Sequence, residues 1–358
     1  MTPRSLFLLC LALSLVPVTG AQTALQLPPK SAMPPPLPPL PHPTLDRMHA
    51  AHAVNCGVVK EEEDYSRTED HGNRAAFDID LCKAVAVAVL GPGARLIVKS
   101  FPDEPFALRA LRGGEVDLVA TASLSVANTA HDVALSPPIL MDGEGFLYPN
   151  NPAIHSGVDL AGKKVCFLTG SKAEQGIRSY ADAHHITFIW YPFSEAGEME
   201  AAFFTGNCDA VTGDFTQLAN IRGIDARRAA AFTILPETIR QDPLAVATWA
   251  GDVRFGAIVR WTVELLLEAE ALDLTQASVA AAKASPRPEV AQLLGPRYGA
   301  TSELGLRAQW GADVLEAVGN YGEIFDRDLG ANSPVRLNRG ENRLWTQGGA
   351  LVPIPVRD

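Results

Sequence analysis

Residues 142–152, DGEGFLYPNNP, decide the fold, because they lie between two blocks in which strands and helices alternate. Such alternation predicts a parallel sheet in each block, with right-handed crossovers between its strands. We therefore predict that residues 142–152 form the first strand of a hinge between two lobes. Residues 241–248 (QDPLAVAT) follow the second block and are predicted to be the returning strand, which makes the hinge double and the first lobe discontinuous.

The elements of the two blocks are short runs of apolar periodicity that end at glycine, proline or polar residues. In the first block, strands are predicted over 54–59, 95–100 and 116–122, and helices over 78–90 and 105–112. In the second block, strands are predicted over 164–168, 187–191, 209–212 and 233–236, and helices over 172–183, 194–205 and 215–222. Helices over 253–271, 274–284 and 307–319 are expected to pack back on the first lobe, followed by an irregular tail.

The length of the chain predicts its number of lobes, and its charge excludes one class of partner. At 358 residues the chain exceeds the usual size of one domain, so two lobes are expected. The net charge is −11, and the sequence has no run of five or more basic residues. A nucleic-acid partner is therefore excluded, because neutralising phosphates needs concentrated Lys and Arg.

The N-terminus predicts export. Arg4 precedes a short apolar run at residues 6–16 (LFLLCLALSLV), and small residues follow before position 21. This pattern is typical of a secretory signal peptide, predicted over residues 1–20, and the run is too short for a stable membrane anchor. Residues 21–44 are predicted to be a linker, with nine prolines between positions 28 and 43. The mature protein is expected to be soluble and periplasmic.

Four cysteines remain after the predicted cleavage, namely Cys56, Cys82, Cys166 and Cys208. An even number in an exported protein indicates disulfides, and four cysteines allow three pairings. Because two lie in each predicted lobe, we favour Cys56–Cys82 and Cys166–Cys208, with buried free thiols as the alternative. Their spacing does not fit zinc, and no metal or cofactor site is predicted.

Several short motifs occur in the collinear order of a known family. They are FDIDLCKAV (77–85), GEVDL (114–118), DGEGF (142–146), VCFLTGS (165–171), NCDAVTGD (207–214), AVGNYGEIF (317–325), RGENRLW (339–345) and GGALVPIPVR (348–357). In these motifs the chain resembles the family 3 solute-binding proteins of polar amino-acid ABC transporters, and most of all their general L-amino-acid-binding subgroup. The resemblance covers roughly residues 45–357, and all four mature cysteines fall at subgroup positions.

The resemblance implies a type II periplasmic-binding-protein fold, in which two α/β lobes joined by a two-strand hinge close on one ligand. Lobe 1 would span residues 45–147 and 244–358, and lobe 2 residues 148–243. The implied function is capture of a polar amino acid for an ABC permease in the inner membrane, by a monomer that is not an enzyme and carries no cofactor. A divergent sensor or interaction module remains an alternative, as does a dehydratase-like enzyme on the same fold.

The resemblance also implies a set of ligand-binding residues. Asp214 would bind the α-ammonium group, although it could equally cap the helix that follows it. Thr169, Gly170 and Ser171 would form an anion cradle at a helix N-terminus, where an ordinary cap is the alternative. The remaining predicted contacts are Tyr65 and Ser66, and, after the third strand, Thr121, Ser123 and Ser125.

Two departures from the family pattern leave the ligand open. Relatives carry an arginine for the ligand carboxylate shortly after Ser125, where this chain has VANTA over 126–130, and Lys172 is the candidate substitute. The loop at 61–64 (EEED) is also unusually acidic. Together with Asp214 and Glu144, this loop would favour a cationic ligand, such as a basic amino acid or a polyamine-like compound. A solvated charge run on a loop is the alternative.

Overall fold

The computed structural model describes residues 43–59, 74–130, 132–224, 227–294 and 303–356, and residues 40–358 form one compact unit. The predicted signal peptide, most of the predicted linker, Tyr65, Ser66 and the acidic loop at 61–64 lie outside the described residues. Within the described part, no helix is both long and apolar enough to cross a membrane.

The strands form one sheet. They are β1 (Ala53–Val59), β2 (Arg95–Phe101), β3 (Leu118–Ser123), β4 (Val133–Pro149), β5 (Lys164–Leu168), β6 (Ile189–Phe193), β7 (Ala210–Asp214), β8 (Phe232–Ile234) and β9 (Arg240–Trp249). Their order is β2-β1-β3-β9-β4-β7-β5-β6, with β8 paired to β4. The pairs β1–β2, β1–β3, β5–β6 and β5–β7 are parallel, as the alternation of strands and helices predicted.

The helices precede, connect or follow these strands. They are α1 (Pro43–Ala51), α2 (Arg74–Leu90), α3 (Glu104–Arg112), α4 (Val126–Thr129), α5 (Lys172–His184), α6 (Ala196–Phe204), α7 (Phe215–Gly223), α8 (Val253–Ala271), α9 (Val279–Ala282), α10 (Pro288–Leu294), α12 (Trp310–Val318) and α13 (Tyr321–Asp328). Short 3-10 turns lie at Gly157–Leu160, Ala229–Ala231, Gly340–Asn342 and Trp345–Gln347.

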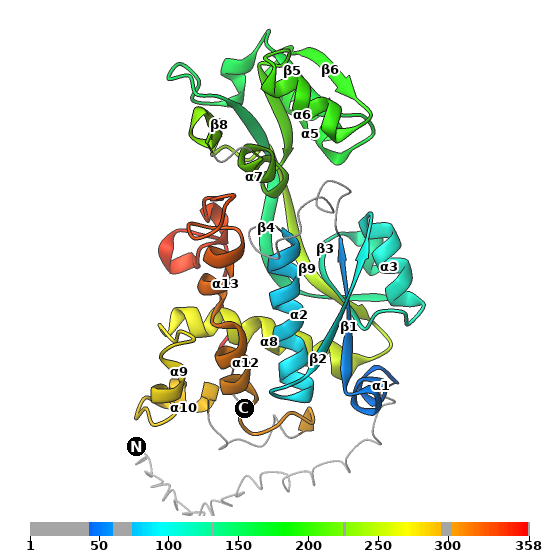
Figure 1. The fold of residues 1–358 in the computed structure, drawn as a ribbon, viewed down its shortest axis with the longest axis vertical. Coiled ribbons are helices and arrows are strands. Elements are labelled where there is room, and N and C mark those ends of the chain that lie inside the picture. Colours follow the sequence, from blue (N-terminus) through cyan, green and yellow to red (C-terminus); the bar gives the residue numbers. More distant parts are fainter. Residues whose placement is uncertain (1–42, 60–73, 131, 225–226, 295–302, 357–358) are drawn as a thin grey trace, which may run out of the picture. The chain divides into compact units, whose positions relative to one another are not determined.

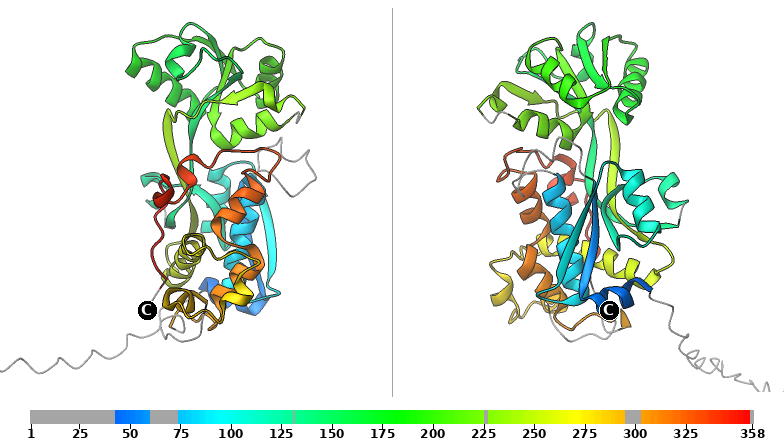
Figure 2. Two further views of the ribbon diagram at one scale, coloured as in Figure 1. Left: turned by 90° about the vertical axis from the view of Figure 1, so that its left-hand side faces the viewer. Right: turned by 45° about the vertical axis from the view of Figure 1, so that its right-hand side comes forward.

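Two groups of elements lie on either side of the long strands β4 and β9, which run side by side between them (Figures 1 and 2). The first lobe holds β1–β3, helices α1–α3 and the helices after β9, of which α8, α12 and α13 pack against α2. The second lobe holds β5–β8 with α5–α7. β4 and β9 pair antiparallel in a register that sets Asp142 opposite Asp242. The predicted two-lobe α/β fold with a two-strand connection is confirmed.

Each lobe has its own hydrophobic core and its own disulfide. One large cluster in the first lobe joins α2, α8, α12 and α13 to the sheet, and it includes Phe77, Phe255 and Phe325. Smaller clusters cover the two faces of the second-lobe sheet. Cys56 is bonded to Cys82 and Cys166 to Cys208, with Cα–Cα separations of 6.1 and 5.9 Å. The favoured pairing is confirmed.

The helical region after β9 differs from the sequence prediction. The helix predicted over 274–284 is only the single turn α9, since Thr275 and Ser278 bond each other's backbone in a turn before it. The tail predicted as irregular contains a further helix, α13. Asn320 is its N-cap and forms a capping box with Glu323, and the preceding Gly319 has a φ of 84°. The helix starts anew there because a glycine in the left-handed region ends α12.

The RGENRLW motif fastens the C-terminal segment to the connection between the lobes. Asn342 is buried and bonds both backbone groups of Met141 on β4, at 2.6 and 3.0 Å. Arg339 forms a bidentate ion pair with Glu270 on α8, at 2.7 and 3.0 Å. The segment therefore fixes the edge of β4 against the first lobe, which gives these motif residues a structural role.

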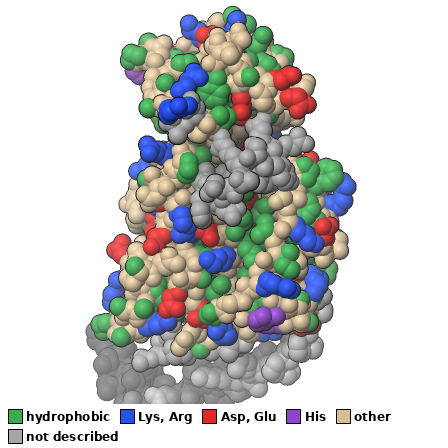
Figure 3. All heavy atoms as spheres, in the orientation of Figure 1, with side chains coloured by type: hydrophobic (Ala, Val, Ile, Leu, Met, Phe, Trp, Pro, Cys, Tyr) green, Lys and Arg blue, Asp and Glu red, His purple; other side chains and the backbone are tan. Residues whose placement is uncertain are grey.

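Basic and acidic side chains are interspersed over the face that Figure 3 shows. This agrees with the net charge of −11 and with the absence of basic runs in the sequence.

Candidate ligand-binding site

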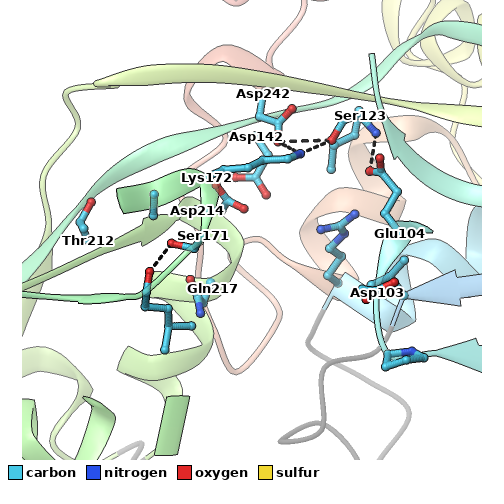
Figure 4. Close-up of a pocket in the computed structure, with 16 residues that line it drawn as sticks. Asp103, Glu104, Ser123, Asp142, Ser171, Lys172, Thr212, Asp214, Gln217 and Asp242 are labelled. Atoms are coloured by element: carbon cyan, nitrogen blue, oxygen red, sulfur yellow. Dashed lines mark hydrogen bonds and ion pairs between the residues drawn. The ribbon is translucent and has the colours of Figure 1, made fainter. Parts of the chain in front are cut away.

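A cavity of about 220 Å³ lies at the carboxyl ends of the strands, where the two lobes face each other. Sites in open α/β sheets occur at this position. Its charged lining consists of five acids against two basic residues, shown in Figure 4: Asp103, Glu104, Asp142, Asp214 and Asp242, with Arg74 and Lys172. The cavity is therefore strongly acidic among the described residues.

Asp214 has a buried carboxylate oxygen that no group of the described residues hydrogen-bonds. It is the last residue of β7 and stands at the N-terminus of α7, yet its side chain makes no capping hydrogen bond. Its Oδ1 is buried with no hydrogen-bond partner among the described groups. Burial, followed by the charges of Asp142 and Asp242, raises the pKa of Asp214 to about 7. The helix-cap alternative is not what the structure shows, and the carboxylate is available to an incoming cation.

Asp142, by contrast, is fully used by the protein. Its Oδ2 accepts the Thr216 hydroxyl at 2.6 Å, and its Oδ1 accepts the Gly143 amide at 2.9 Å. Burial raises the pKa of Asp142 above its usual range. Because it ties β4 to the start of α7, we assign this acid to positioning α7 rather than to the ligand.

Glu144 does not line the cavity but lies beneath its second-lobe wall. It is fully buried and accepts bonds from Arg240 at 3.2 Å and from Thr212 at 3.1 Å. Burial raises the pKa of Glu144 to about 7 despite these bonds. A Cβ atom at Gly176 on α5 would overlap its carboxylate. Gly176 is thus the position at which α5 can approach the buried acid.

Replacing Gly176 with alanine is expected to destabilise the second lobe by about 1–3 kcal/mol, because the added methyl overpacks a buried carboxylate that cannot move into solvent. The change should lower the urea midpoint of unfolding. Ser179→Ala on the exposed face of the same helix is the matched control and should change the midpoint little. Equal midpoints for the Gly176→Ala variant and the wild type would contradict the packing described above.

Of the three ligand contacts predicted after the third strand, one lines the cavity and two are bonded elsewhere. Ser123 is buried and lines the cavity. Thr121 does not line it, because its hydroxyl donates to Asp78 at 2.9 Å and accepts from Arg74 at 3.0 Å. Ser125 caps α4 by accepting the Asn128 amide at 3.2 Å. The structure therefore brings one of the three predicted residues into the cavity wall, and their role as ligand contacts stays a prediction.

The predicted anion cradle at residues 169–171 is internally bonded. The Gly170 amide donates to Glu174 at 2.8 Å, and the Ser171 hydroxyl caps α5 by accepting the Glu174 amide at 3.1 Å. The Thr169 amide donates to Phe193 at 2.8 Å, and Thr169 is exposed outside the cavity. Ser171 does line the cavity. A ligand contact of this loop would thus have to compete with its own hydrogen bonds.

Lys172 crosses the cavity from the second lobe. Its Nζ donates to the Ser123 hydroxyl at 2.6 Å and pairs with Asp242 of β9 at 3.0 Å (Figure 4). Half of its side chain is exposed. In this structure a protein ammonium group therefore occupies the acidic cavity and neutralises one of its carboxylates.

Several cavity residues were missed by the sequence interpretation, among them Glu104, Asp242 and Arg74. Glu104 and Asp242 sit at the start of α3 and in β9, where an acid is expected as a helix-start residue or as an ordinary strand-end charge. Arg74 is the first residue of α2, just before the FDIDLCKAV motif. Their spacing carries no motif signal, and only the tertiary fold brings them together.

Four buried carboxyl groups make the ligand-free protein more stable in mild acid. Burial raises the pKa of Asp78, Glu144, Asp214 and Asp328 to about 7 each. Their unfolded values lie near 4, so the folded state binds more protons and stability is lost as pH rises toward 7. The free energy of unfolding, measured with urea, should therefore be higher near pH 5.5 than near pH 8. A higher value at pH 8 would contradict these assignments.

Comparisons with known proteins found relatives whose matches cover most of this chain and most of the relative. The general L-amino acid-binding periplasmic protein AapJ of Rhizobium johnstonii is 34% identical over 319 residues, covering 88% of this chain and 93% of that protein. The glutamate/glutamine/aspartate/asparagine-binding protein BztA of Rhodobacter capsulatus is 32% identical over 317 residues. This match covers 88% of this chain and 93% of BztA. A scan against models of protein families found no match.

Among solved structures, an ABC-transporter periplasmic binding protein from Brucella ovis with glutathione bound is similar at a TM-score of 0.74. It is 32% identical, and the match covers 88% of this chain and 99% of that one. These similarities extend over both lobes and their connecting strands.

Proposed function

Because the chain belongs to the periplasmic amino-acid-binding proteins of ABC transporters, we propose that it captures a small amine-bearing solute, in the first place an amino acid, between its lobes and delivers it to a permease. The buried oxygen of Asp214, which has no hydrogen-bond partner among the described residues, carries this proposal. A ligand ammonium would supply the missing partner and lower the pKa of a carboxyl group that burial and its neighbours raise.

The proposed lobes are residues 45–147 with 244–358, and residues 148–243. The paired strands β4 and β9 would act as the hinge, bending where they pass between the lobes. Tyr65, Ser66, Thr121, Ser123, Ser125, Thr169 and Ser171 remain proposed ligand contacts beside Asp214. Ser123, Ser171 and Asp214 have the best support, because they line the cavity.

The protein is proposed to work in the periplasm as a monomer, after cleavage of the signal peptide at residues 1–20. Two disulfides, one in each lobe, support an oxidising compartment. Binding without catalysis is proposed because the named relatives are binding proteins. The permease would be its partner in the inner membrane.

Titration calorimetry with a panel of amino acids and amines tests the proposal. At least one amine-bearing solute is expected to bind the mature protein with one-to-one stoichiometry and to raise its melting temperature. The same solute should stabilise an Asp214→Asn variant far less. A panel that neither binds nor stabilises the wild type would count against solute capture.

A further inference from the structure

The donors expected to receive the ligand carboxylate in the first lobe already hold a carboxylate of the protein. Glu104 is the first residue of α3, directly after its N-cap Asp103. Its Oε2 accepts the Ser123 amide at 2.8 Å (Figure 4), and its Oε1 accepts the Asn128 side-chain amide at 2.8 Å. Ser123 and Asn128 belong to the segment in which relatives are expected to read the carboxylate.

This arrangement makes the first-lobe wall unfavourable for a second carboxylate. The neighbouring Leu124 amide is also used, because it donates to the Pro243 carbonyl at 2.8 Å. A ligand carboxylate placed here would face the negative charge of Glu104, and like charges at such short range repel each other. Residues 126–130 supply no arginine to offset this repulsion, and the guanidinium of Arg74 donates to the Thr121 hydroxyl at 3.0 Å.

The cavity already holds one cation, the ammonium group of Lys172. Lys172 places its ammonium between the Ser123 hydroxyl and the Asp242 carboxylate, at 2.6 and 3.0 Å. Among the described residues these two groups are the ones that hold the tip of its half-exposed side chain, so it can leave the cavity when a ligand cation arrives. Asp214 offers a further buried carboxylate oxygen without a partner among the described groups. The cavity therefore presents two acidic positions for cations.

From these contacts we infer that the cleft selects a small dication through its amino or guanidino groups, and that an α-carboxylate on the ligand contributes no affinity. This rests on the proposed function, since it assumes that the cavity between the lobes holds the solute. According to this inference, Glu104 is a specificity-determining residue that lies where a ligand carboxylate would bind. Lys172 is an internal cation that the ligand displaces.

Arginine and agmatine form the sharpest test, because agmatine is arginine without its carboxylate. Calorimetry on the wild-type mature protein is expected to give agmatine a Kd equal to or lower than that of arginine. In a Glu104→Gln variant, removal of the like charge should shift the ratio of the two Kd values toward arginine by about tenfold. Glu115→Gln, an exposed acid paired with Lys99 outside the cavity, makes the same charge change and should leave the ratio unaltered.

Lys172→Met provides an independent variant in case Glu104→Gln fails to fold. Losing the internal cation should tighten agmatine binding several-fold, because the ligand no longer has to displace an ammonium from Asp242. Weaker arginine binding in this variant, with agmatine unchanged, would mean that Lys172 reads a carboxylate and would overturn the inference.

Two further outcomes separate this inference from the function on which it rests. If the wild type binds arginine ten times more tightly than agmatine, the inference is overturned and solute capture stands. The same holds if the wild type binds a neutral amino acid but neither arginine nor agmatine. Failure of the whole panel of amino acids and amines to bind removes both.

Discussion

Replacing Asp214 with asparagine should weaken solute binding by about 2–4 kcal/mol, or roughly thirtyfold to a thousandfold, because a buried charged partner of the ligand ammonium is lost. Asparagine keeps the size of the side chain, so the cavity keeps its shape. Calorimetry with the best ligand of the wild type measures the loss.

The stability of the same variant gives a second, opposite readout. Asp214 has a buried oxygen without a described partner and a pKa raised to about 7 by burial and by the charges of Asp142 and Asp242. At pH 8 the neutral asparagine should therefore leave the melting temperature unchanged or higher. Asp182→Asn, an exposed acid on α5, is the control and should alter neither binding nor stability. Unimpaired binding by the Asp214→Asn variant would contradict the assigned role.

Removing the second-lobe disulfide should cost about 4 kcal/mol of stability. Cys166 and Cys208 are separated by 42 residues, and closing a loop of that length restricts the unfolded chain by about this amount. A Cys166→Ala/Cys208→Ala variant should therefore unfold at a markedly lower urea concentration.

The first-lobe disulfide provides the comparison. Cys56 and Cys82 are separated by 26 residues, which predicts a slightly smaller loss of about 3.5 kcal/mol for the corresponding double variant. Reduction of both bonds in the wild type should lower the midpoint at least as far as either variant. A loss below about 1 kcal/mol in the second-lobe variant would contradict the loop-closure argument.

Local patterns were enough to predict the two-lobe fold. The stretches DGEGF and QDPLAVAT are strand-forming runs between α/β blocks, and the structure pairs them as β4 and β9. Asp214, which lines the cavity, was predicted as a ligand contact because it follows a buried strand within a family motif. α13 was missed because its signal is a single capping box after Gly319, within a region where several helices follow one another without strands.

The charge chemistry of the cleft could not be predicted in the same way. Glu104 is separated from Ser123 by a helix and most of a strand, and their contact exists because α3 begins on the side of the sheet where β3 ends. Lys172 and Asp242 come from α5 and β9, which lie 70 residues apart in the chain. Long-range pairs of this kind leave no periodicity or spacing in the sequence.

Small-angle X-ray scattering of the mature protein, with and without the solute that calorimetry identifies, tests the central claim most directly. Closure of the two lobes around the solute predicts a smaller radius of gyration at saturation, and no such change for the Asp214→Asn variant at the same concentration. An unchanged radius of gyration for a wild-type protein that calorimetry shows to be saturated would contradict capture by lobe closure.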